Sequence, residues 1–117
     1  MRLRLEEKRL EIGSRTYVLR CNMAVLDMLE ATYGDFQTFF ALPLREAHAA
    51  VLAAMLNDYS DDMGWDPEWT ARKVKKIFPY AALRDLDLIG MLTRAVTPAN
   101  AAAEAQTKTE PGDDAGN

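Results

Sequence analysis

The sequence has one cysteine, one histidine and no glycine-rich loop, and these shortages exclude several classes of function. The single cysteine, Cys21, cannot form an internal disulfide, which fits a reducing, cytoplasmic compartment. The single histidine, His48, cannot by itself supply a histidine-rich metal site or a paired-histidine mechanism. No nucleophile elbow, phosphate loop or zinc-protease motif is present. We therefore expect no enzyme, no cofactor and no metal.

Long apolar runs are also missing. No stretch approaches the roughly 18 consecutive apolar residues of a membrane-spanning helix, and no segment has the flanks of a signal peptide. With 117 residues, 49% of them hydrophobic and 27% charged, the chain is large enough to bury one core. We expect a single domain over residues 1–96, located in the cytoplasm and without a membrane partner.

Positive charge and large apolar side chains are scarce at the C-terminal end. The net charge of the chain is -4, and residues 97–117 hold four carboxylates against one lysine. The same segment contains no Leu, Ile, Val, Phe, Tyr or Trp, so it offers no apolar surface to offset the entropy lost on ordering. The sequence predicts a disordered acidic tail over residues 97–117.

Apolar and polar residues alternate with a period of two through residues 3–21, which is typical of strands. Gly13 and Ser14 suit a two-residue hairpin loop, because glycine tolerates the positive φ of such turns. This loop sets Leu10 opposite Tyr17. The sequence therefore predicts a β-hairpin at the start of the chain.

A further strand before this hairpin is an open alternative. A turn at Glu7 and Lys8 would pair Leu5 with Leu10 and produce a three-stranded meander. The match of charges across this pairing, Arg4 with Glu11 and Glu6 with Arg9, favours the meander. Glu-Lys is poor turn chemistry, however, and the alternative is a single hairpin with a frayed or bulged first strand. Both arrangements lead to the same fold class, α+β.

The rest of the chain has helical periodicity. Asn22 is a suitable N-cap for a helix over residues 23–33, Gly34 ends that helix, and Asp35 can cap a short helical piece. Further helices are expected over residues 44–63, from near Asp66 or Thr70 to residue 78, and over residues 80–96. The predicted fold is thus a hairpin or meander followed by a mainly α-helical domain of four to five helices.

The helix over residues 44–63 has the strongest signal, because Ala, Leu and Met dominate it without Gly or Pro. One stripe of side chains recurs at spacings of three and four and is expected to face the core. This stripe comprises Leu44, His48, Val51, Leu52, Met55, Tyr59 and Met63. The residues expected to face elsewhere are Arg45, Glu46, Ala49, Ala53 and Asn57.

The helix over residues 80–96 has a broad apolar surface around Gly90, which includes Leu88, Met91 and Leu92. Such a surface either packs within the monomer or forms a contact in a homo-oligomer. The sequence leaves both possibilities open.

Aromatic residues supply the candidate partner-binding residues. Trp65 and Trp69 flank the turn after the long helix, while Phe39 and Phe40 precede it. Tryptophan is enriched at interface hot spots, and exposed aromatic patches mark partner sites. The alternative for each pair is a place in the core, where aromatic side chains of a small domain usually lie.

A basic cluster offers a different hypothesis. Arg72, Lys73, Lys75 and Lys76 lie in one predicted helix that is followed by Pro79 and another helix. Four cations could neutralise DNA phosphates, as in a small transcriptional regulator. The acidic residues just before the helix and the slightly acidic folded part argue against nucleic acid as the partner.

Four segments together resemble a known family. They are residues 10–20 (LEIGSRTYVLR), 22–30 (NMAVLDMLE), 33–36 (YGDF) and 53–59 (AAMLNDY). In this order they resemble the tail assembly chaperones of long-tailed bacteriophages and prophages, over roughly residues 3–96.

The resemblance implies a small cytoplasmic helper in tail morphogenesis. Such a protein coats the hydrophobic tape-measure protein, keeps it soluble and recruits tail-tube subunits, and it is absent from the finished particle. The implied partners are therefore the tape-measure protein and the tail-tube protein. A chaperone of this type requires apolar grooves for helical segments rather than positioned acids and bases.

Overall fold

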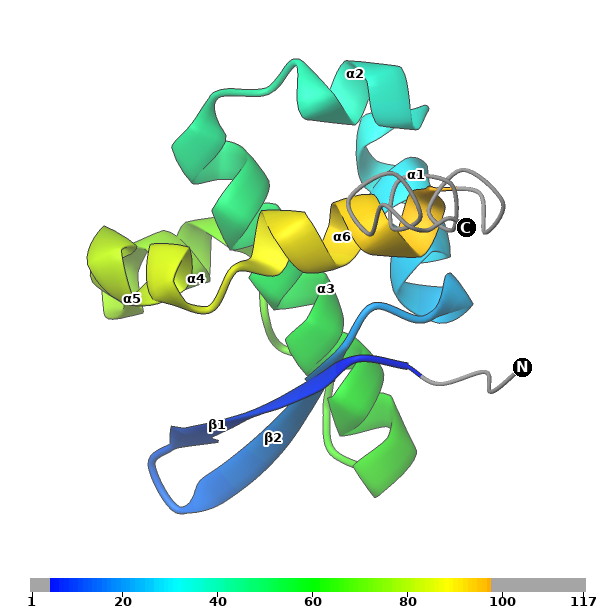
Figure 1. Ribbon diagram of the computed structural model, residues 1–117. Helices are drawn as coiled ribbons and strands as arrows, with labels where there is room; N and C mark the ends of the chain where they lie inside the picture. The colour runs from blue at the N-terminus through cyan, green and yellow to red at the C-terminus, as the bar shows by residue number, and fades with distance from the viewer. Residues whose placement is uncertain (1–4, 98–117) are drawn as a thin grey trace, which may run out of the picture.

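A computed structural model of the protein describes residues 5–97 and has a β-hairpin followed by six helices in that range (Figure 1). The elements in chain order are β1 (Glu7–Ile12), β2 (Arg15–Arg20), α1 (Met23–Tyr33), α2 (Phe36–Phe40), α3 (Leu44–Met63), α4 (Ala71–Ile77), α5 (Tyr80–Asp85) and α6 (Leu88–Val96). The predicted α+β class is confirmed. The predicted disordered tail lies, apart from Thr97, outside the described residues.

The hairpin has the predicted register. Leu10 pairs with Tyr17 in an antiparallel sheet of two strands, and Gly13 has a φ of 62° in the connecting turn. The alternative turn at Glu7 and Lys8 is wrong, because both residues lie inside β1 and pair with β2. Extending the strand over these two residues satisfies their backbone groups in the ladder, which a Glu-Lys turn would not do.

The first two helices are capped as predicted. The side-chain oxygen of Asn22 accepts a hydrogen bond from the Val25 N–H at 2.9 Å. The Asp35 carboxylate accepts one from the Thr38 N–H at 2.8 Å. Gly34 joins these helices with a φ of 90°, a conformation that favours glycine.

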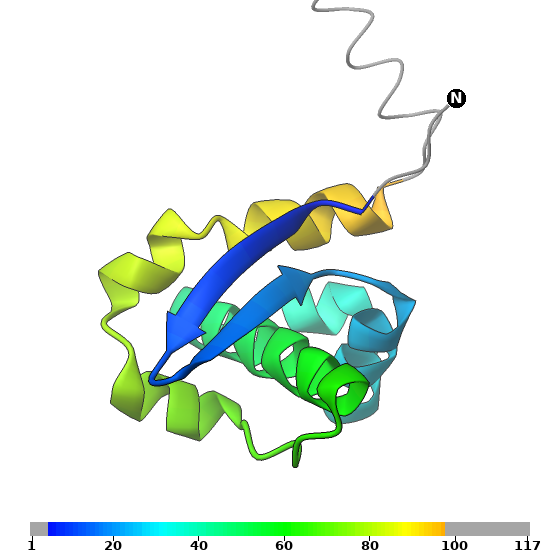
Figure 2. The ribbon, with the colours of Figure 1, turned by 90° about the horizontal axis from the view of Figure 1, so that it is seen from below.

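Helix α3 is the centre of the molecule. Strand β2 and helices α1, α4, α5 and α6 all pack against it. Figure 2 shows the hairpin lying across α3, while α4, α5 and α6 follow one another around it. Every residue from Ala47 to Leu56 is buried, so neighbouring elements cover most of this part of α3.

The predicted stripe on α3 is therefore partly wrong. Its central residues are buried as expected, but Leu44 and Met63 at the two ends are 60% and 49% exposed. Ala49 and Ala53, which were expected to face elsewhere, are also buried. The physical reason is that five elements surround the middle of the helix, whereas its ends extend beyond them.

The single helix predicted over residues 80–96 is wrong, because the structure has two helices there, α5 and α6. The described residues therefore contain six helices rather than the four to five expected. The break falls between α5 and α6, where Asp87 has a left-handed φ of 56°. Gly90 makes room for this turn, since a Cβ there would lie 2.3 Å from the Asp87 carboxylate. The break lets Leu83 and Leu88 both reach the core.

The apolar surface of α6 packs largely within the monomer. Leu88, Met91 and Leu92 are buried, and α6 lies against α3. Before it, α4 begins after Thr70, whose hydroxyl accepts a hydrogen bond from the Lys73 N–H at 3.1 Å. None of the helices within residues 5–97 is both long enough and apolar enough to cross a membrane.

Candidate partner-binding groove

Strand β2 brings the two predicted tryptophans together. The ring of Tyr17 lies between them, with centroids 5.4 Å from Trp65 and 6.3 Å from Trp69. Trp69 is 6% exposed, and its indole N–H donates a hydrogen bond to the Tyr17 hydroxyl at 3.4 Å. Trp65 is half-buried beneath the Arg15 guanidinium, 4.2 Å from the ring centroid. Trp69 is thus a core residue at the edge of the surface, and Trp65 is more accessible.

The two predicted phenylalanines differ in the same way. Phe39 is fully buried and packs edge-on against Tyr33, with ring centroids 5.7 Å apart. Phe40 is 44% exposed and packs against the rings of Phe36 and Phe39. Of this pair, only Phe40 offers a surface to a partner.

A groove between α1 and α4 connects the neighbourhoods of these two pairs. Its volume is about 290 Å³. Its floor is formed by Ala50, Ala53 and Ala54 of α3, while Tyr33 lines it from α1 and Trp69 from the start of α4. The groove exists because alanine side chains leave the space between the flanking helices unfilled. We call this hollow the alanine groove.

The alanine groove was missed in the sequence, although a signal for it exists. Ala50, Ala53, Ala54 and Asn57 recur at spacings of three and four, which places them on one face of α3. Of these residues, Ala53 and Asn57 were expected to face away from the core stripe, and Ala50 and Ala54 carried no assigned role. A run of small residues between two flanking amphipathic helices is the pattern that could have indicated a groove.

A polar bridge lies beside the Tyr33 end of the alanine groove and joins three helices. The Tyr33 hydroxyl of α1 donates a hydrogen bond to the Glu46 carboxylate of α3 at 3.1 Å. The Lys75 ammonium of α4 also donates to Glu46. The Lys75 hydrogen bond holds the pKa of the Glu46 carboxyl below its usual value. Burial, assisted by Glu46, raises the pKa of Tyr33.

A second hollow of about 340 Å³ lies on the other side of this bridge. It is lined by Pro43, Arg45, Glu46, Lys75, Tyr80 and Leu83. Arg45 is exposed and forms no ion pair within residues 5–97, whereas Lys75 is paired with Glu46. Glu46, the one carboxylate that lines it, already accepts hydrogen bonds from Lys75 and Tyr33. We therefore call it the basic hollow.

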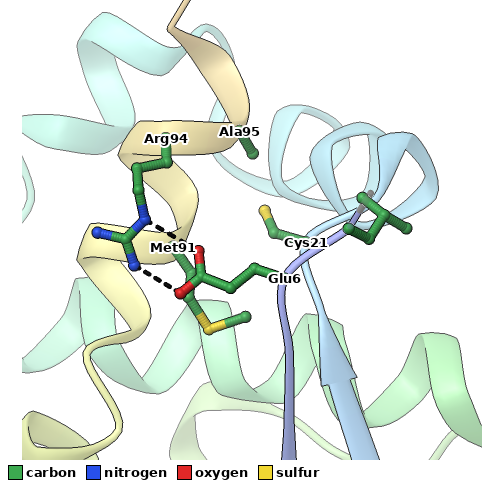
Figure 3. Close-up of a pocket in the computed structure, with 6 residues that line it drawn as sticks. Glu6, Cys21, Met91, Arg94 and Ala95 are labelled. Carbon is green, nitrogen blue, oxygen red and sulfur yellow. Dashed lines mark hydrogen bonds and ion pairs between the residues drawn. The ribbon is translucent and has the colours of Figure 1, made fainter. Parts of the chain in front are cut away.

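Cys21 faces a third, smaller hollow of about 130 Å³ near α6 (Figure 3). Burial raises the pKa of its thiol to about 11, so the thiol is protonated at neutral pH and is a poor nucleophile. Glu6 and Arg94 form a bidentate ion pair at the rim, with distances of 2.8 and 2.9 Å. The hydrogen bond from Arg94 lowers the pKa of Glu6. The ion pair between Glu6 and Arg94 therefore connects the N-terminal segment to α6.

The basic cluster on α4 is partly engaged within the chain. Lys73 forms an ion pair with Glu68 at 3.1 Å and lies 4.6 Å from the centroid of the Trp69 ring. Lys75 is paired with Glu46. Only Arg72 and Lys76 of the four cations form no ion pair within the described part of the chain.

Comparisons with protein-family models, with curated proteins and with solved structures found no match for this chain. Between residues 5 and 97, no group of three or more His, Cys, Asp or Glu side chains is arranged to hold a metal ion. A function must therefore be argued from the grooves of this molecule and from the resemblance in its sequence.

Proposed function

We propose that this protein is a tail assembly chaperone of a long-tailed phage or prophage. It binds helical segments of the tape-measure protein in the bacterial cytoplasm and helps to recruit tail-tube subunits. The observation that carries this proposal is the alanine groove between α1 and α4, about 290 Å³ in volume. The family resemblance supplies the identity of the partner.

The shape of the alanine groove suits the side chains of a helix better than a small molecule. Its volume is at the low end of ligand pockets, which span roughly 300–1,000 Å³. Its alanine floor allows a partner backbone to approach closely, and an amphipathic helix presents aliphatic side chains at i, i+3, i+4 and i+7. Two or three such side chains would fill the groove.

An exposed apolar side chain beside the groove-lining residues extends the surface available to a helix. Phe40 in α2 is 44% exposed. Tyr33, which lines the groove, packs against Phe39, and Phe39 in turn packs against Phe40. A long tape-measure helix could therefore contact the groove and then the α2 corner.

Co-expression tests the proposal. The tape-measure protein encoded beside this chain should be insoluble alone and should be recovered in a soluble complex with this chain. The tail-tube subunit should be retained by that complex in a pull-down. If the solubility of the tape-measure protein is the same with and without this chain, the proposed function is wrong.

Matched variants locate the binding surface. Ala54→Leu fills the groove from its floor and should reduce the recovery of the complex, while Ala31→Leu adds the same atoms to an exposed position of α1 and should not. Trp65→Ala and Phe40→Ala test the two accessible aromatic residues. Circular dichroism and the melting temperature of each free variant show whether it remains folded.

A further inference from the structure

We infer that the alanine groove takes a partner helix in one direction, with acidic residues of that helix over the basic hollow. This inference rests on the proposed function and specifies the chemistry of the partner. The occupant is an amphipathic helix of a partner protein. It has Ala- or Leu-sized side chains along one face and carboxylates at one end.

The two hollows follow one another along the same side of α3. Glu46 lines the basic hollow and Ala50 lines the alanine groove, four residues later. Residues four apart lie on the same face of a helix, one above the other. The hydrogen bond from Tyr33, which lines the groove, to Glu46 also joins them. A helix lying in the groove therefore has one end beside the basic hollow.

The charges at that end are unbalanced. Lys75 and the Tyr33 hydroxyl already bond the Glu46 carboxylate, which leaves the positive charge of Arg45 without a partner in residues 5–97. Lys76, the residue after Lys75 in α4, is exposed and adds a further cation. A partner carboxylate would find a complementary field here.

The opposite end of the groove has the opposite character. Asn57 and Trp69 line the groove there, and the Lys73 ammonium over the Trp69 ring is already paired with Glu68. Four residues beyond Asn57 the same face of α3 carries Asp61, which is exposed, and Asp66 is exposed in the segment after α3. Acidic residues at this end would repel a partner carboxylate, so the two ends together fix the direction of the helix.

The test uses two fluorescein-labelled synthetic helical peptides of 18 residues with an identical Leu/Ala face. One ends in three glutamates, and the other ends in three lysines at the same positions. Binding to the full chain is measured by fluorescence anisotropy at low ionic strength, where exposed charges are least screened. The glutamate peptide should bind about fivefold more tightly, which corresponds to about 1 kcal/mol.

Two variants with matched controls assign this difference to the site. Ala54→Leu should weaken both peptides by roughly tenfold, which corresponds to about 1.4 kcal/mol, while Ala31→Leu should leave both unchanged. Arg45→Glu should abolish or reverse the preference for the glutamate peptide. Arg9→Glu, an exposed charge reversal in β1, should leave the preference intact.

The inference is overturned if neither peptide binds, if both bind equally, if Ala54→Leu has no effect, or if Arg45→Glu preserves the preference. These outcomes are separate from failure of the proposed function. A tape-measure protein that is solubilised while the peptides fail would leave the function standing with a different binding surface. Peptide binding as expected, without solubilisation, would leave a directional helix-binding groove with another partner protein.

Discussion

The side-chain amide of Asn57 forms two hydrogen bonds with the backbone of Trp69, twelve residues further along the chain. Its NH₂ group donates to the Trp69 carbonyl at 2.8 Å, and its oxygen accepts from the Trp69 N–H at 2.9 Å. This pair of hydrogen bonds fixes the segment before α4 against α3. It thereby sets the position of the Trp69 ring against Tyr17 and the width of the alanine groove, which both residues line.

Asn57→Ala should destabilise the protein by about 1–3 kcal/mol, because it leaves two partly buried backbone groups of Trp69 without their partners. Urea unfolding followed by tryptophan fluorescence measures the change. Asp61→Ala, at an exposed position one turn later on α3, should stay within about 0.5 kcal/mol of the wild type. Similar losses in both variants would show that the two hydrogen bonds do not hold the segment.

Two alanines of α3 should respond in opposite ways to the same enlargement. Ala49 has no exposed surface, so Ala49→Leu should overpack the core and cost about 1–3 kcal/mol. Ala54 lines the groove, where a larger side chain can enter open space, so Ala54→Leu should cost less than about 1 kcal/mol. Chemical denaturation of both variants checks this difference, and equal costs would mean that the groove is not open.

Stability should fall as the pH rises from about 9 to about 11 because of Cys21. The folded thiol keeps its proton up to a pKa of about 11, whereas its ordinary value is 9.0. Over this interval the unfolded state loses the proton and the folded state retains it, so deprotonation favours unfolding. The contribution is full below the lower pKa and decreases by at most about 3 kcal/mol through this interval.

Urea unfolding at several pH values between 8 and 11 measures that decrease. The Cys21→Ala variant is the control, because it lacks the thiol and should show a shallower dependence on pH. The slopes are compared rather than the absolute stabilities, since removal of the sulfur also changes packing. Parallel slopes for the two proteins would contradict a buried, protonated thiol.

The protein should not bind duplex DNA at physiological salt. Lys73 and Lys75 are engaged with Glu68 and Glu46, which leaves Arg72 and Lys76 of the α4 cluster for phosphates. Each phosphate contact contributes a slope of nearly one in the logarithm of affinity against the logarithm of salt concentration, so two contacts give only weak binding. Electrophoretic mobility shifts at 50 and 150 mM salt provide the measurement. A complex that persists at the higher salt and disappears in an Arg72→Glu, Lys76→Glu double variant would favour a regulator.

The sequence by itself determined the local features of this protein. The hairpin register follows from Gly13, which adopts positive φ in a two-residue turn, and from alternation along both strands. The caps at Asn22 and Asp35 are equally local, because each side chain bonds a backbone N–H three residues later. The extent of α3 follows from helix formers uninterrupted by Gly or Pro, ended by Gly64 in a left-handed conformation.

The tertiary structure decided which faces are buried and what lies between them. Periodicity gives the spacing of a stripe but not the number of neighbouring elements. Five elements pack against α3, and all residues along Ala47–Leu56 are buried. The break at Asp87 accompanies the burial of both Leu83 of α5 and Leu88 of α6, and Gly90 is its only local signal in this segment.

The candidate site depends on the same long-range packing. The sequence supplied Trp69 as a candidate, but the groove that it lines forms only when α1 and α4 flank the alanines of α3. The basic hollow likewise requires the pairing of Lys75 with Glu46, 29 residues apart in the chain. Local rules predict each of these helices, and only their packing places the unfilled space beside Arg45, which has no ion pair within residues 5–97.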